Sequence, residues 1–188
     1  MPDTQVNKVP KKIILGSGKL YAITYAGLEE IPDEDELCQE DNIIGYVQGG
    51  AVLEYTLESY SAKDDLGLAQ KDLFMADSAT LKSGIMTFNG DTIARLIATA
   101  DSETAGNKRT TMIGGIENVH DSRLVTCFCN KDAVDGNTYV TIVGSNQGAL
   151  SLAFAKDKES VINLEFKAQP AFEGGRLIRL TETEPEVG

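Results

Sequence analysis

Alternation of apolar and polar residues with a period of two is the pattern that most constrains this fold. In AVLEYTLESY, residues 51–60, Leu53, Tyr55 and Leu57 share one side of an extended strand, opposite a row of polar residues. Such strands bury one face and leave the other in water. Turn-forming clusters of Gly, Asn and Asp separate these stretches. We predict strands over 11–15, 19–25, 43–48, 51–60, 79–88, 110–113, 121–130, 138–145, 151–155, 161–168 and 176–181.

One segment has helical spacing instead. FNGDTIARLIATAD has apolar residues at i, i+3, i+4 and i+7, namely Ile93, Leu96, Ile97 and Ala100. Either Asn89 or Asp91 can cap the start of this helix. The pattern therefore predicts a mainly β fold, an antiparallel sandwich or barrel-like structure with one flanking α-helix at about residues 90–101.

The chain of 188 residues is long enough for one domain with a sizeable core, so we expect a single domain over 1–188. The N-terminal arm 1–12 and the C-terminal tail 182–188 are expected to be extended. After the strand at 51–60 comes a polar stretch, and we predict a long inter-strand loop at about 59–78. The segment Glu29–Asp41 is densely acidic and has no basic residue, which predicts a solvated loop.

Charge and composition exclude several classes of protein. The formal net charge is −12, whereas binding to nucleic-acid phosphates needs clustered Lys and Arg. No apolar stretch is long enough to span a membrane, and the first residues lack the apolar core of a secretory signal. We therefore expect the chain to be made and folded in a cytoplasm, without membrane insertion of its own.

No motif indicates catalysis, a cofactor or a metal. GSGKL lacks the spacing and the Ser or Thr of a phosphate-binding loop, and DEDELCQEDNII lacks the Gly and final Glu of a calcium loop. His120 is the one histidine, and no nucleophile motif accompanies it. Cys127 and Cys129 point to the same side of a strand, so we expect buried, reduced thiols, although a metal role stays open. The sequence thus predicts a protein that is not an enzyme.

The order of the elements resembles the major tail tube protein of long-tailed, siphovirus-like bacteriophages and prophages. The resemblance covers about Gly45 to Thr181: GYVQGGAVLEY, a long excursion, the return strand ATLKSGIMTF, the helix GDTIARLIAT, and the late strands GALSLAFAKDKESVINLEFKAQP and GGRLIRLTE. It implies a homohexameric ring of β-sandwich subunits, and rings that self-assemble into a hollow tube in the tail of the virion. The implied partners are other copies of the chain, tail-tip or baseplate, tape-measure and terminator proteins, and DNA that passes through during genome ejection without sticking.

The resemblance also implies a role for the excursion, which in this family reaches an adjacent ring. Its residues here are Ser61, Lys63, Asp64, Asp65, Leu66, Leu68 and Leu73. Alternation suggests which side chains face the lumen, with Glu54, Thr56 and Glu58 as the first candidates and Asn163 and Glu165 as the second. Carboxylates there would repel DNA phosphates at short range. Two other functions stay open: the tube of a contractile tail or secretion-type injection apparatus, and an acidic carbohydrate- or cation-binding β-sandwich.

Overall fold

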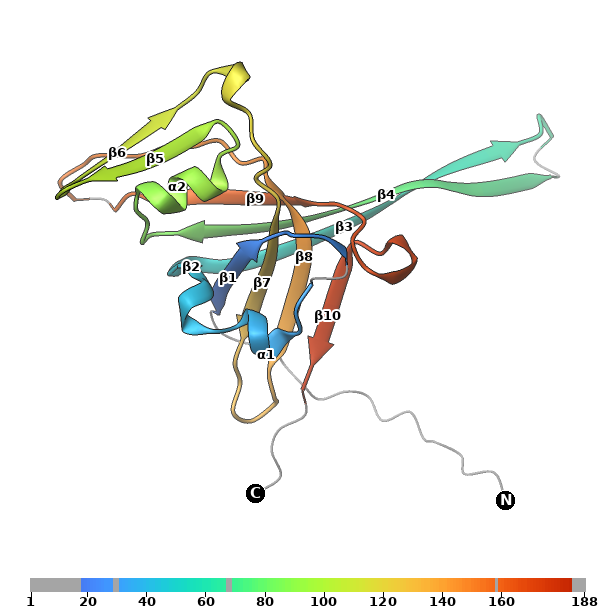
Figure 1. Ribbon diagram of the computed structural model, residues 1–188. Coiled ribbons are helices and arrows are strands. Elements are labelled where there is room, and N and C mark those ends of the chain that lie inside the picture. The colour runs from blue at the N-terminus through green and yellow to red at the C-terminus, as the bar shows by residue number, and fades with distance from the viewer. Residues whose placement is uncertain (1–17, 29–30, 67–68, 158, 184–188) are drawn as a thin grey trace.

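The protein is mainly β and antiparallel, as the alternation predicts. The computed structural model describes residues 18–28, 31–66, 69–157 and 159–183 (Figure 1). The strands are β1 (Lys19–Thr24), β2 (Ile43–Gly45), β3 (Val47–Lys63), β4 (Gln70–Ile85), β5 (Ala100–Ala105), β6 (Lys108–Ile113), β7 (Leu124–Asn130), β8 (Thr138–Asn146), β9 (Ile162–Ala168) and β10 (Ile178–Glu182). Most predicted strands are therefore confirmed, with ends that differ by a few residues.

One branched sheet contains most of these strands. They are hydrogen-bonded in the order β2-β1-β7-β8-β9-β4-β3, and β10 pairs with β8 as a branch. The first part of β8, residues 138–142, pairs with β10, whereas residues 144–146 pair with β9. In Figure 1 the strands β9, β4 and β3 run across β7, β8 and β10 as a second layer. The sheet thus folds over itself, which agrees with the predicted sandwich-like fold.

Two apolar cores lie on opposite faces of β1, β7 and β8. Neighbouring residues of β7 serve both, because Leu124 belongs to the first core and Val125 to the second. The first core lies between the two layers and under the helix α2 (Gly90–Leu96); its buried members include Leu20, Leu81, Ile93, Ile142, Leu164 and Phe166. The second core contains Tyr21, Leu37, Val125, Cys127, Cys129, Tyr139, Val143 and Ala171.

The flanking helix is confirmed, but it is shorter than predicted. Asn89 caps it, because the Asn89 side chain accepts the backbone N–H of Thr92 at 3.0 Å and Thr92 reaches back to the Asn89 backbone. The helix ends at Leu96, and Ile97 already has an extended backbone. Ala100 is buried, but it starts β5 instead of completing a helical face. β5 and β6 form a separate two-stranded hairpin, and β5 is an element that the sequence did not predict.

The predicted long inter-strand loop at about 59–78 is wrong for most of its described residues, because they continue β3 and β4 as paired strands. Residues 59–63 pair with 70–74, and 56–58 pair with 76–78. β3 and β4 are consequently 17 and 16 residues long and extend beyond the body of the protein (Figure 1). The backbone N–H and C=O groups that the two strands turn toward each other are paired, and this pairing continues where no core lies beneath the hairpin. Neither face is buried there, so Tyr55 and Leu57 are exposed although the alternation predicted one buried face.

The predicted solvated loop over Glu29–Asp41 is wrong for its second part. This part contains α1 (Glu34–Leu37) and the start of a 3-10 helix (Glu40–Asn42). The Asp33 side chain accepts the Glu36 N–H at 3.0 Å as an N-cap, and Leu37 is fully buried. Acidic residues suit the first turn of a helix because they lie near the positive end of its dipole. Leu37 packs into the second core and so anchors α1 to the body.

Some predicted elements either form no named strand or lie outside the described residues. The predicted strand at 151–155 forms no named strand, although Leu152 packs against the first core. The predicted strand at 11–15 and the arm at 1–12 lie outside the described residues. So does most of the tail at 182–188, of which Glu182 ends β10.

Candidate assembly surfaces

All five predicted lumen residues share one exposed face of the sheet. Glu54, Thr56 and Glu58 alternate along β3, and Asn163 and Glu165 alternate along β9. β4 lies between these two strands, and its register with each keeps the two rows on the same side. The opposite side of β9 and of the first part of β3 packs on the first core. The structure therefore brings the two separate candidate rows together into one surface, which we name the polar face.

Two cations also lie on the polar face, and the sequence prediction named neither as a lumen candidate. Lys82 of β4 lies between the carboxylates, with its Nζ 2.6 Å from Glu54 Oε2 and 4.0 Å from Glu165 Oε1. The hydrogen bond to Glu54 raises the pKa of the Lys82 ammonium. Lys167 continues the Asn163–Glu165 row on β9. Alternation along β9 alone places Lys167 with Asn163 and Glu165, whereas the position of Lys82 between the two rows becomes visible only once the strand order is known.

The polar face consequently has mixed charge. Glu54, Glu58 and Glu165 contribute three carboxylates, and Lys82 and Lys167 contribute two ammonium groups. Close pairing with Lys82 reduces the field that Glu54 and Glu165 project away from the surface. The face is therefore only weakly acidic, in contrast to the strongly acidic surface that Glu54 and Glu58 alone suggested.

The outer half of the β3–β4 hairpin, which we call the arm (residues 55–77), carries large apolar side chains in water. Its exposed apolar members are Tyr55, Leu57, Tyr60, Leu66, Leu73, Phe74 and Met75. Phe74 and Met75 keep about two thirds of their surface exposed, at 67% and 69%. The pairing shifts register between Glu58 and Ser59, so a bulge separates the two halves of the arm. Proteins that stay monomeric rarely expose so many large apolar residues together. The cluster on the arm therefore indicates a surface that a partner covers.

The predicted inter-ring residues that the structure describes lie at or near the tip of the arm. Ser61 Oγ donates to Asp72 Oδ1 across the hairpin. Asp64 Oδ1 accepts the Ala69 N–H at 2.7 Å and so stabilises the turn. Lys63 and Asp65 are exposed, Leu66 is 80% exposed, and Leu73 is exposed on β4. Leu68 lies outside the described residues. The other six predicted residues are thus on one protruding element, part of it strand and part of it turn.

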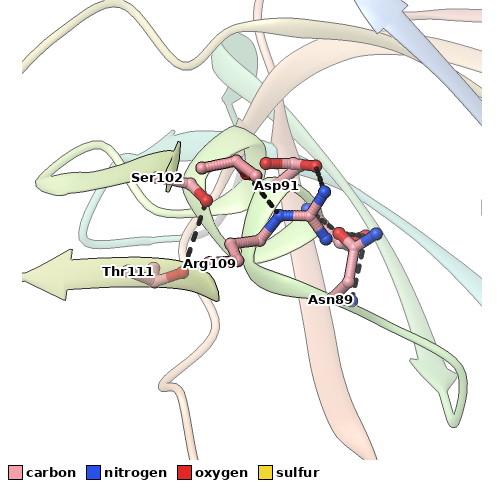
Figure 2. Close-up of polar contacts among 7 residues, drawn as sticks. Asn89, Asp91, Ser102, Arg109 and Thr111 are labelled. Atoms are coloured by element: carbon pink, nitrogen blue, oxygen red, sulfur yellow. Dashed lines mark hydrogen bonds and ion pairs between the residues drawn. The ribbon is translucent and has the colours of Figure 1, made fainter. Parts of the chain in front are cut away.

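A second exposed apolar strip lies on the β5–β6 hairpin and the turn after it, and sequence reasoning did not find it. Its members are Met112, Ile113, Ile116 and Val119. The hairpin is fixed to α2 by an ion pair of 2.8 Å between Arg109 Nη2 and Asp91 Oδ2 (Figure 2). Thr111 Oγ1 also donates to Ser102 Oγ at 3.4 Å within the hairpin. This strip is therefore held in place on a braced element.

His120 is exposed, and its backbone N–H donates to the carbonyl oxygen of Ala98 at 2.8 Å. Next to it, hydrogen bonds from Arg123 lower the pKa of Asp121 to about 2. Arg123 in turn lies over the Tyr25 ring, 5.0 Å from its centroid. These contacts tie the start of β7 to the end of β1, and they account for the polar cluster at this position structurally.

Two kinds of feature are absent from the described residues. No group of three or more His, Cys, Asp or Glu side chains in this part of the chain is arranged to hold a metal ion. Within the same ranges, no helix has the length and apolar character needed to cross a membrane.

Comparison with known proteins gives no family for the chain. No protein-family model matches it, and no curated protein matches it significantly.

Proposed function

We propose that this chain is the structural subunit of a bacteriophage or prophage tail tube and that it self-assembles into stacked, hexameric rings. The observation that carries the proposal is the arm. It extends beyond the body and exposes Tyr60, Leu73, Phe74 and Met75, which cover nothing in their own protomer. Apolar side chains that project into water are stabilised when a neighbouring copy of the chain covers them.

The edge of the sheet supports the same proposal. Among the described strands, β3 pairs with β4 alone, so its outer edge presents a row of backbone groups along 17 residues. Such long open edges invite pairing with another chain. Pairing between protomers around a ring removes these edges. An arm that reaches the next ring makes a head-to-tail contact that does not close, and contacts of that type build filaments.

The polar face suits the lumen of such a tube. The other side of β9 and of the first part of β3 packs on the first core, which leaves Glu54, Asn163 and Glu165 free to face a channel. Thr56 and Glu58 continue the same face into the arm. A weakly acidic surface with paired charges repels phosphate only slightly and offers DNA no basic groove in which to bind. Lys82 is held by two carboxylates, so DNA would have to break these ion pairs to bind it. Passage without retention follows from this balance.

Removal of the arm tip tests the proposal. Deletion of residues 62–71, with a short turn in their place, removes no member of either core. We expect a folded protomer whose thermal unfolding is close to that of the parent chain. We also expect that it forms no long tubes in electron micrographs, because the contact between rings is lost.

Point variants separate the apolar contact from the length of the arm. The double substitution Leu73→Ser and Phe74→Ser should shorten or abolish tubes, since it removes exposed apolar surface without shortening the hairpin. Val134→Ser is the matched control, because Val134 is 78% exposed in the β7–β8 loop and belongs to neither hairpin. The proposed role of the arm is wrong if the deletion and the double substitution both still give long tubes.

A further inference from the structure

Three cysteines from two distant parts of the chain lie together at the second core. Cys127 and Cys129 lie on β7 and are buried, and Cys38 follows α1 and is partly exposed. The Cys38 Sγ is 3.7 Å from the Cys127 Sγ, and all three thiols are free. Residues 38 and 127 are 89 positions apart, so the fold alone brings the two sulfur atoms together.

Several contacts hold Cys38 at this place. Its backbone N–H donates to the Glu34 carbonyl oxygen at 2.9 Å and ends α1. α1 is anchored to β10, since Arg179 Nε lies 2.8 Å from Glu34 Oε1 and Arg179 Nη2 donates to the Pro32 carbonyl at 2.7 Å. Next to Cys38, Leu37 is fully buried in the second core. The thiol of Cys38 is therefore presented to β7 by a docked element.

We propose that Cys38 and Cys127 form an intramolecular disulfide when the folded chain meets an oxidising thiol–disulfide couple. A disulfide bond is about 2.0 Å long, so the two sulfur atoms must approach further from 3.7 Å, which side-chain rotation and a small shift of the turn after α1 can supply. Cys129 competes with Cys38 as a partner for Cys127. It shares its strand and its side with Cys127, and a bond between these two has unfavourable geometry.

The reaction balances with glutathione disulfide as the oxidant. The Cys38 thiolate attacks one sulfur of the oxidant, forms a mixed disulfide and releases one glutathione thiolate, which takes up a proton. The Cys127 thiolate then attacks the Cys38 sulfur, forms the internal bond and releases the second glutathione. Cys38 reacts first because it is partly exposed, whereas Cys127 is fully buried. Two protein thiols are oxidised and one disulfide is reduced to two glutathiones.

The thiol pair is expected to react slowly. The Cys38 S–H donates to Cys127, which raises the pKa of Cys38 and lowers that of Cys127. The partly exposed Cys38 thiol is thus mostly protonated at neutral pH, whereas the thiolate is the reactive form of a cysteine. The chain would stay reduced in a cytoplasm and become cross-linked on longer exposure to an oxidising medium. This inference stands whether or not the chain forms tubes.

The experiment is peptide mapping of the full-length chain after incubation with glutathione disulfide. Trypsin should release residues 20–63, which contain Cys38, and residues 124–131, which contain both other cysteines. We expect these peptides joined, with the mass of two hydrogens lost. The joined species should persist in Cys129→Ala and disappear in Cys127→Ala. Circular dichroism of the reduced variants controls for folding.

Thermal unfolding gives a second readout. A bond that closes a loop this long should raise the melting temperature of the oxidised chain by about 5–15 °C over the reduced chain. Cys38→Ala treated in the same way should show no such rise. The proposal is overturned if the native wild-type chain keeps three alkylatable thiols, carries only mixed glutathione disulfides, or joins Cys38 to Cys129 alone.

Discussion

Tyr21 shows how one residue couples the second core to pH. It is 2% exposed on β1, and burial raises the pKa of its phenol to about 12. The folded state therefore keeps the phenol proton at a pH where the unfolded chain, with a pKa of about 10, has released it. Stability that depends on this proton is fully present below pH 10 and is lost as the pH rises toward 12.

We predict that Tyr21→Phe flattens the alkaline loss of stability. In the parent chain this phenol should cost about 1 kcal/mol of unfolding free energy by pH 11, because unfolding releases its proton. Urea unfolding between pH 9 and 11.5, with reductant present, measures the slope. Tyr46→Phe is the control for loss of a tyrosine hydroxyl, since Tyr46 is 59% exposed and is not a member of the second core. Equal slopes for Tyr21→Phe and the parent chain would contradict the claim that burial in the second core raises the pKa of Tyr21.

At the scale of the element, the contact between α2 and the β5–β6 hairpin depends on a residue without a side chain. Gly90 begins α2, and a Cβ built there lies 2.2 Å from Thr111 Oγ1 and 2.9 Å from Arg109 Cδ. These contacts are shorter than atoms tolerate, so a larger residue must push the hairpin away from the helix. The ion pair of Arg109 with Asp91 would be strained by the same movement (Figure 2).

We therefore predict that Gly90→Ala destabilises the protein by about 1–2 kcal/mol, although Ala favours a helix more than Gly does. Urea unfolding measures the change. Thr111→Ala removes the nearest obstructing atom, so Gly90→Ala should cost clearly less in a Thr111→Ala background. A stabilising effect of Gly90→Ala in the parent chain would show that the hairpin is not packed tightly against α2.

Period-two alternation predicted most elements because it reports burial of one strand face, and β9 with Leu164 and Phe166 inward is the clearest case. In the arm this reasoning failed in two ways: Tyr55 and Leu57 alternate with polar residues although both are exposed, and beyond residue 60 the alternation stops, so the paired strands there went unpredicted. Ala100 completed a helical period by coincidence, and the extended Ile97 ended α2 first. Lys82 and Cys38 were missed as partners for another reason. Their neighbours depend on strand order and on docking of α1, which are long-range properties that no local pattern contains.

At the scale of the whole molecule, two apolar cores stabilise the body, while the arm, the outer edge of β3 and the strip at the end of β6 lie outside them. Exposed apolar side chains on two different hairpins and an open strand edge suit a protein that contacts other copies of itself. The proposed tube explains these features together, whereas a monomeric binding module leaves the arm without a role.

The central claim of self-assembly is tested most directly by particle size in solution, followed by negative-stain electron microscopy of the same sample. Light scattering of the purified full-length chain should show particles much larger than its 20.2 kDa protomer, and micrographs should show rings or hollow tubes. Preassembled tail tips added as nuclei should increase the yield of tubes. A chain that stays monomeric at high concentration, with and without these nuclei, would contradict the account.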